Sequence, residues 1–114
     1  MTIVRTNKEL SAAERYHLTM SPAIQKMKDV KGANITVSEW CIYEDTDKDD
    51  KPQTILSILT KEGKIFATNS RTFINDFVKM WELFEECGET VNSINVTSGF
   101  SNANREYITC VYAD

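Results

Sequence analysis

Hydrophobic and polar residues follow a helical period in the first third of the chain and an alternating period after it. Ser11-Ala12-Ala13-Glu14 has the capping-box form, in which the serine and glutamate side chains accept hydrogen bonds from backbone N–H groups at a helix start. Ser21-Pro22 is a second candidate start, because proline is tolerated at the first helical position. Apolar residues follow at helical spacing as far as Gly32. We therefore expect residues 1–33 to form a helical N-terminal arm, with two short helices or one helix broken at Pro22.

From residue 35 onward, short segments are rich in β-branched and aromatic residues and alternate between apolar and polar positions, which is typical of strands. Loop-forming residues separate these segments. They are the acidic tract 44–50 closed by Lys51-Pro52, a tight turn at Gly63, and a turn-rich stretch at residues 98–104. The predicted strands are residues 35–43, 54–60, 65–68, 91–97 and 106–112.

A strongly amphipathic helix is predicted between the third and fourth of these strands. It follows the cap-forming residues Thr68, Asn69 and Ser70 and ends at Gly88. The order strand-strand-strand-helix-strand-strand is that of a five-stranded oligonucleotide/oligosaccharide-binding (OB) barrel. The same order also fits an open sheet with a helix packed on one side. The apolar stripe of the helix consists of Phe73, Ile74, Phe77, Val78, Met80, Trp81 and Phe84.

Length and composition fit one soluble domain over residues 1–114. With 114 residues, 41% of them hydrophobic, the chain has the size and the apolar content for a single core. We predict a mainly β protein with helices (α+β), in which residues 34–114 form the OB-like barrel. No apolar run approaches the roughly 20 residues of a membrane span, and residues 1–20 are charged where a signal peptide is apolar. These features indicate a cytoplasmic protein with no membrane partner.

Residues that usually carry catalysis or bind metals are sparse. The only histidine, His17, lies in the polar first third, with no nucleophile at a recognisable spacing. Cys41, Cys87 and Cys110 contain no C-x-x-C pair, so neither a disulfide scaffold nor a zinc site is indicated. The sequence has no glycine-rich phosphate loop and no nucleophile elbow. We expect a protein that is not an enzyme and that uses no metal or cofactor.

The net charge of −4 is concentrated in one tract. Residues 44–50 hold five acids and one base, so the rest of the chain is neutral and any nucleic-acid site must be a local patch. Asp45, Asp47 and Asp49 match the first three ligand positions of an EF-hand loop. The sixth position, which needs glycine, is Asp50, and the twelfth, which needs glutamate, is Leu56. This mismatch excludes an EF-hand and favours a solvated hairpin loop.

Binding of single-stranded nucleic acid is the most specific functional hypothesis. Such proteins stack bases on aromatic side chains and meet phosphates with lysine or arginine. Trp40 lies opposite Val37 and Cys41 in the strand alternation, so we expect it to face outward, as a stacking platform or as a subunit contact in a homo-oligomer. Two observations support other interpretations: Phe66 and Tyr107 also suit a core, and the acidic loop would repel a phosphate backbone. The candidate binding residues are Trp40, Lys61, Lys64, Phe66, Arg71, Phe100, Arg105 and Tyr107.

Three segments of the chain resemble the small single-stranded DNA-binding proteins encoded by tailed phages of Gram-positive bacteria. The resemblance implies an OB-like fold that coats exposed single strands during phage DNA replication or recombination, in the host cytoplasm and without a cofactor. It also implies replication or recombination proteins as partners, although residues 112–114 lack the acidic tail through which this family recruits them. The segments are Ser21-Pro22-Ala23-Ile24-Gln25-Lys26-Met27, Ile65-Phe66-Ala67-Thr68-Asn69-Ser70 continuing into Phe73-Ile74, and Ser101-Asn102-Ala103-Asn104-Arg105-Glu106-Tyr107-Ile108-Thr109.

The sequence therefore leaves two functional hypotheses. The first is a protein that binds single-stranded DNA without strong sequence preference. The second is a small phage accessory module that binds a host or phage protein through its acidic loop and exposed aromatic residues. Salt dependence separates them, because electrostatic DNA binding weakens steeply as salt is added.

Overall fold

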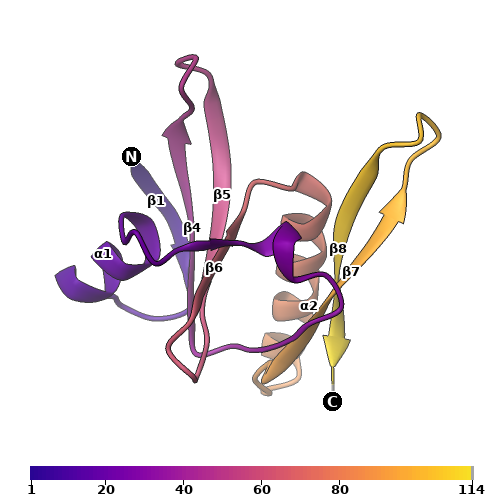
Figure 1. Ribbon diagram of the computed structural model, residues 1–114. Coiled ribbons are helices and arrows are strands. Elements are labelled where there is room, and N and C mark those ends of the chain that lie inside the picture. Colours follow the sequence, from indigo (N-terminus) through magenta and orange to yellow (C-terminus); the bar gives the residue numbers. More distant parts are fainter. Residues whose placement is uncertain (114) are drawn as a thin grey trace.

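Two β-sheets and two α-helices form the α+β fold of the computed structural model, which describes residues 1–113 (Figure 1). The predicted mixture of mostly strands with few helices is confirmed. The first sheet has the strand order β1 (Thr2–Thr6), β4 (Glu39–Thr46), β5 (Pro52–Leu59), β6 (Ile65–Thr68), β2 (Gln25–Lys26). The second sheet has the order β3 (Asn34–Thr36), β7 (Ser93–Phe100), β8 (Glu106–Ala113). The helices are α1 (Ala12–Thr19) and α2 (Arg71–Glu86), and a 3-10 turn, η1 (Met27–Val30), follows β2.

The chain passes from one sheet to the other between β3 and β4. Sequence alternation predicts one strand over residues 35–43, but the structure divides it at Val37 and Ser38. The Val37 N–H donates to the carbonyl of Asn92, just before β7, and the Ser38 N–H donates to the carbonyl of Leu59 in β5. Neighbouring residues are thus bonded to different sheets. Within residues 1–113 no strand pairing joins β6 to β8, so the two sheets do not close into a barrel.

The main hydrophobic core lies between the two sheets and α2. Ser70 caps α2 as predicted, with its hydroxyl accepting a hydrogen bond from the Phe73 N–H. Trp40 is fully buried in this core, and its ring meets Phe77 and Trp81 edge to face at centroid distances of 5.2 and 5.3 Å. The prediction that Trp40 faces outward is therefore wrong. The prediction fails because the strand breaks at residues 37–38, so the alternation of inward and outward side chains before the break does not continue into β4.

A second, smaller core covers the other face of the first sheet. Leu18 of α1, Leu10, and the β4 residues Cys41 and Tyr43 are buried there. Because both faces of β4 are covered, the residues from Trp40 to Tyr43 are all buried and do not alternate.

Three charged side chains fasten α1 to the start of β4. Lys8 Nζ lies 2.9 Å from a carboxylate oxygen of Glu14 and 2.9 Å from one of Glu39. Burial raises the pKa of Glu39 above its usual range. The hydrogen bond with Glu39, together with those from Ser11 and Lys8, lowers the pKa of Glu14 to about 2. The capping box of Ser11 and Glu14 is present as predicted.

The N-terminal segment differs from the predicted helical arm. Residues Thr2–Thr6 form β1, an edge strand antiparallel to β4, and only α1 is an α-helix. The predicted helix after Pro22 is reduced to the 3-10 turn η1 over Met27–Val30, because Gln25–Lys26 instead pair in parallel with Phe66 and Ala67 of β6. Backbone pairing across the fold has overridden the helical spacing of this segment. No helix in residues 1–113 is long and apolar enough to cross a membrane.

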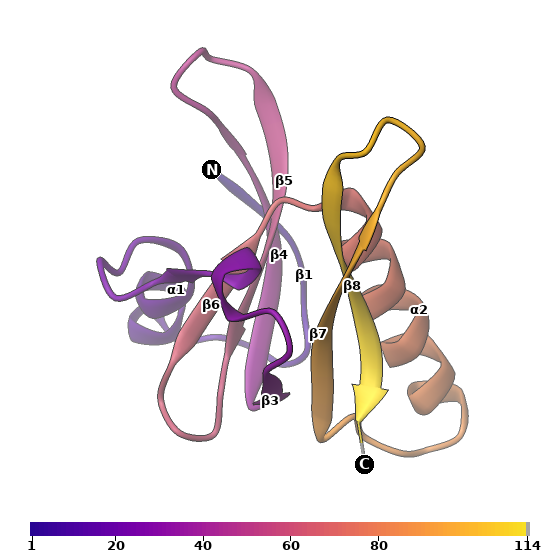
Figure 2. The ribbon, with the colours of Figure 1, turned by 45° about the vertical axis from the view of Figure 1, so that its right-hand side comes forward.

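The hairpins β4–β5 and β7–β8 project from the same side of the molecule, as both ribbon views show (Figure 1 and Figure 2). Both extend further than the sequence predicts. Residues 44–46 of the acidic tract belong to β4, and residues 98–100 of the turn-rich stretch belong to β7. The turn between β5 and β6 lies at the opposite end of β5, about 23 Å away for strand steps of about 3.3 Å.

Candidate functional site

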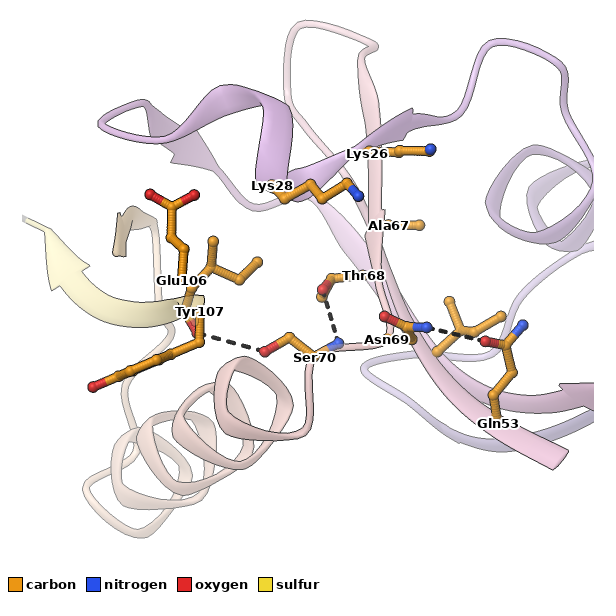
Figure 3. A pocket seen from close by; sticks show the side chains of 11 residues that line it. Lys26, Lys28, Gln53, Ala67, Thr68, Asn69, Ser70, Glu106 and Tyr107 are labelled. Carbon is orange, nitrogen blue, oxygen red and sulfur yellow. Dashed lines mark hydrogen bonds between the residues drawn. The ribbon is translucent and has the colours of Figure 1, made fainter. Parts of the chain in front are cut away.

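An open pocket of about 500 Å³ lies between β6 and β8, where the two sheets face each other without pairing (Figure 3). β2 and η1 form one side of it, and β5 together with the residues after β6 forms another. The start of β8 closes the third side. Its apolar lining includes Ile55, Ala67 and Ile108, and its polar lining includes Lys26, Lys28, Gln53, Asn69 and Glu106.

The pocket carries uncompensated positive charge. Lys26 and Lys28 are exposed, and neither forms an ion pair with another residue of the described chain. In the view of Figure 3 they lie on one side of Ala67, with Asn69 and Gln53 on the other. Glu106 is the carboxylate of the lining, and Lys31 lies 2.5 Å from it, outside the pocket. Because Glu106 is already paired, an anion at Lys26 and Lys28 meets reduced repulsion from it.

Near its tip, the β7–β8 hairpin carries two exposed aromatic residues, Phe100 and Tyr107, on opposite faces. Phe100 pairs directly across the strands with Glu106, so both project from the face that lines the pocket and, further along, packs into the main core. Phe100 is 66% exposed. Tyr107 also contributes to the pocket lining, but its side chain projects from the opposite face of the hairpin and lies across Gly99, where an added Cβ would come within 3.0 Å of the Tyr107 ring. In Figure 3 its ring points away from Lys28.

A second open pocket of about 530 Å³ adjoins the first on the other side of Asn69. Arg71, the exposed first residue of α2, lines it, together with Gln53 and Glu44 of the β4–β5 hairpin. Gln53 and Asn69 line both pockets, and the Asn69 Nδ2 donates to the Gln53 Oε1 at 3.1 Å. These two amides therefore form the boundary between the two hollows.

The structure places some of the predicted binding residues near the pockets and others in the core or at a distant turn. Phe66, 6% exposed, and Trp40 are both core residues, so neither can stack a base. Lys61 and Lys64 are exposed but lie at the β5–β6 turn, at the end of the first sheet opposite the projecting hairpins. The predicted residues that line a pocket or belong to the β7–β8 hairpin are Arg71, Phe100, Arg105 and Tyr107.

Comparison with protein families, curated proteins and solved structures found no match. The choice of candidate site residues therefore depends on the geometry of the pocket alone. Sequence patterns did not point to Lys26, Lys28, Gln53 or Asn69. The two lysines follow Pro22 at apparent helical spacing, and Asn69 sits among cap-forming residues. Gln53 lies one residue before the predicted strand 54–60, next to Pro52, where it reads as part of the loop.

Proposed function

We propose that the protein binds single-stranded DNA in the space between its two projecting hairpins, with no strong sequence preference. One observation carries this proposal: a two-thirds exposed phenylalanine, Phe100, lies on the hairpin face that lines a pocket with two lysines, neither of which forms an ion pair within residues 1–113. A large ring left in solvent contributes little to folding, but it offers a stacking face to a nucleobase. Lys26 and Lys28 supply charges for phosphates at the same opening.

We also propose an OB-like relationship for the fold. The pairing of β4 with β5, β5 with β6, β3 with β7, and β7 with β8 supports it, as does the position of α2 between β6 and β7. In such folds the ligand lies across the second and third strands, between the two hairpin loops. Those strands correspond here to β5 and β6, which form the floor of the first pocket. The setting in phage DNA replication or recombination rests on the sequence resemblance.

A salt titration with a labelled oligothymidylate of about 12 nucleotides, within the site sizes of OB-type proteins, tests the function. We expect the logarithm of the binding constant to fall linearly with the logarithm of salt, by about 0.7 for each phosphate neutralised on a single strand. Lys26→Met and Lys28→Met should each reduce this slope by about 0.7.

Lys61→Met and Lys64→Met are the matched controls, because they remove the same charge at the far end of β5. They should leave both the affinity and the slope nearly unchanged. A larger loss from these two variants than from Lys26→Met and Lys28→Met would move the interface away from the pocket. No binding to the wild type at low salt would reject the proposal altogether.

A protein-interaction module remains the second candidate, favoured by the β4–β5 hairpin. Glu44, Asp45, Asp49 and Asp50 are exposed, and none of them forms an ion pair within residues 1–113. An unpaired acidic tip is suited to a basic surface on a partner protein. Absence of oligonucleotide binding at low salt is the result that this candidate predicts.

A further inference from the structure

The two amides between the pockets, Gln53 and Asn69, are hydrogen-bonded to each other and line both hollows. Asn69 donates to Gln53 at 3.1 Å, which fixes the two side chains relative to each other (Figure 3). Within residues 1–113 no other hydrogen bond engages either amide group. The Gln53 nitrogen and the Asn69 oxygen therefore keep donor and acceptor capacity free at the pocket. Side-chain amides bind base edges through such a donor and acceptor combination.

Apolar side chains lie next to these amides, and basic side chains lie beyond the apolar ones. Ile55 lies two positions from Gln53 along β5, and Ala67 pairs with Ser57 of that strand, so these residues share one face of the sheet. Asn69 follows directly after β6 and lines the same pocket. Lys26 pairs with Ala67 across β2 and β6, on the far side of this apolar floor. The pocket volume of about 500 Å³ lies within the roughly 300–1,000 Å³ typical of small-ligand sites.

We propose that this pocket holds a single nucleotide of the bound strand. The base lies against Ile55 and Ala67, with its polar edge at Gln53 and Asn69. The phosphate lies at Lys26 and Lys28. This inference rests on the proposed function and deepens it, because it gives a binder of otherwise low specificity a modest base preference at one position. The ligand is a nucleotide within a strand, and a free nucleotide is the other possible source of the same chemistry.

Homopolymer binding in wild type and amide variants tests the inference. Oligonucleotides of dT, dC and dA, each about 12 nucleotides long, should differ in affinity by about fivefold or more for wild type. Gln53→Met and Asn69→Leu keep the side-chain volume but remove the amide, and each should reduce this range to about twofold. Asn92→Leu is the matched control, because Asn92 is exposed at the opposite end of β7 from the hairpin tip. Lys26→Met should weaken all three oligonucleotides by a similar factor.

Side-chain amide signals of the wild type provide a second measurement that does not depend on the folding of any variant. The NH₂ resonances of Gln53 and Asn69 should shift when an oligonucleotide binds, and those of Asn92 should not. Unshifted Gln53 and Asn69 signals, or an unchanged base preference in the amide variants, would overturn the inference while leaving DNA binding intact. A deoxynucleoside monophosphate that binds as tightly as the oligonucleotides would also overturn it, in favour of a free-nucleotide site. If no oligonucleotide binds, the proposed function itself fails.

Discussion

The β4–β5 and β7–β8 hairpins share the same architecture and differ in charge. Each joins two strands of eight residues through a five-residue turn, 47–51 in the first and 101–105 in the second. The first turn residue donates its N–H to the carbonyl of the fifth, over 2.9 Å in both hairpins. The fourth residue donates to the carbonyl of the first, over 3.0 and 2.8 Å. In both turns that fourth residue, Asp50 or Asn104, has a φ of 59°.

The likeness shows that the backbone of the turn does not require the acidic residues. Aspartate and asparagine both tolerate the left-handed conformation, so either residue suits the fourth position. The sequence Asp-Lys-Asp-Asp-Lys carries a net charge of −1, whereas Ser-Asn-Ala-Asn-Arg carries +1 and makes the same turn. The geometry of this turn therefore does not depend on the sign of the charge that it carries.

Aromatic residues in the core should contribute far more to stability than those on the projecting hairpins. The largest predicted effect tests this difference. Phe66→Ala, in the main core, should lower the free energy of unfolding by about 3–5 kcal/mol. Phe100→Ala, at the exposed end of β7, should change it by less than about 0.5 kcal/mol. Urea denaturation of both variants checks the pair. A large loss of stability in Phe100→Ala would identify that ring as structural and remove the main support for the proposed interface.

Thiol labelling tests whether the strands at the base of each hairpin are buried away from solvent. Burial raises the pKa of Cys41, in β4, to about 11 and that of Cys110, in β8, to about 12. From an ordinary thiol pKa near 9, these shifts reduce the reactive thiolate about a hundredfold and a thousandfold. Cys87 is exposed and serves as the internal control.

With iodoacetamide at pH 8, mass spectrometry should find Cys87 modified and the other two cysteines protected. Raising the pH toward 10 should leave Cys41 and Cys110 largely protonated, since their pKa values lie above that pH. Labelling of Cys110 at a rate similar to that of Cys87 would mean that the second sheet opens readily at the base of its hairpin.

Sequence patterns predicted the parts of the fold that local chemistry determines. The capping residues Ser11 and Ser70, the apolar stripe of α2 and the strand 65–68 are all confirmed. The predictions that failed depend on contacts distant in sequence. The alternation around Trp40 could not reveal that the chain changes sheets at residues 37–38, and helical spacing after Pro22 could not reveal the parallel pairing of β2 with β6.

The candidate site was only partly predictable for the same reason. Phe100, Arg105 and Arg71 were predicted from their residue types and loop positions, and the structure places them on the β7–β8 hairpin or at the second pocket. Lys61 and Lys64 have the right chemistry, but the direction of β5 carries them to the opposite end of the sheet. Lys26 reaches the pocket only because a two-residue strand lies alongside β6.

Exchanging the turn sequences isolates the effect of charge on binding. Replacing residues 47–51 with Ser-Asn-Ala-Asn-Arg changes the tip by two positive charges and keeps the backbone turn. For two charges about 10 Å from a phosphate in water, we expect the oligonucleotide to bind about threefold to fivefold more tightly at low salt. The reverse graft, Asp-Lys-Asp-Asp-Lys at 101–105, should weaken binding by a similar factor. Fluorescence anisotropy measures both, and equal affinities for both grafts and wild type would mean that neither tip borders the strand.

The smallest predicted effect separates the structural acid of the β4–β5 tip from the others. Asp47 Oδ1 accepts hydrogen bonds from the N–H groups of Asp49, at 2.8 Å, and Lys51, at 3.0 Å. In the other hairpin Ser101 accepts a single longer bond from Arg105, at 3.3 Å. Hydrogen bonds contribute about 0.5–1.5 kcal/mol each, and these exposed ones fall near the lower end. Losing two of them in Asp47→Ala should lower the free energy of unfolding by about 1 kcal/mol, and Ser101→Ala should lower it by less.

Asp49→Ala is the matched control, because it removes an exposed carboxylate from the same turn and leaves both bonds to Asp47 in place. Its free energy of unfolding should stay within about 0.5 kcal/mol of the wild type. Urea denaturation, with amide exchange at Asp49 and Lys51, measures these differences. If Asp47→Ala and Asp49→Ala behave alike, the turn is held by its backbone alone, and the charge of all three aspartates at the tip is free of any structural role.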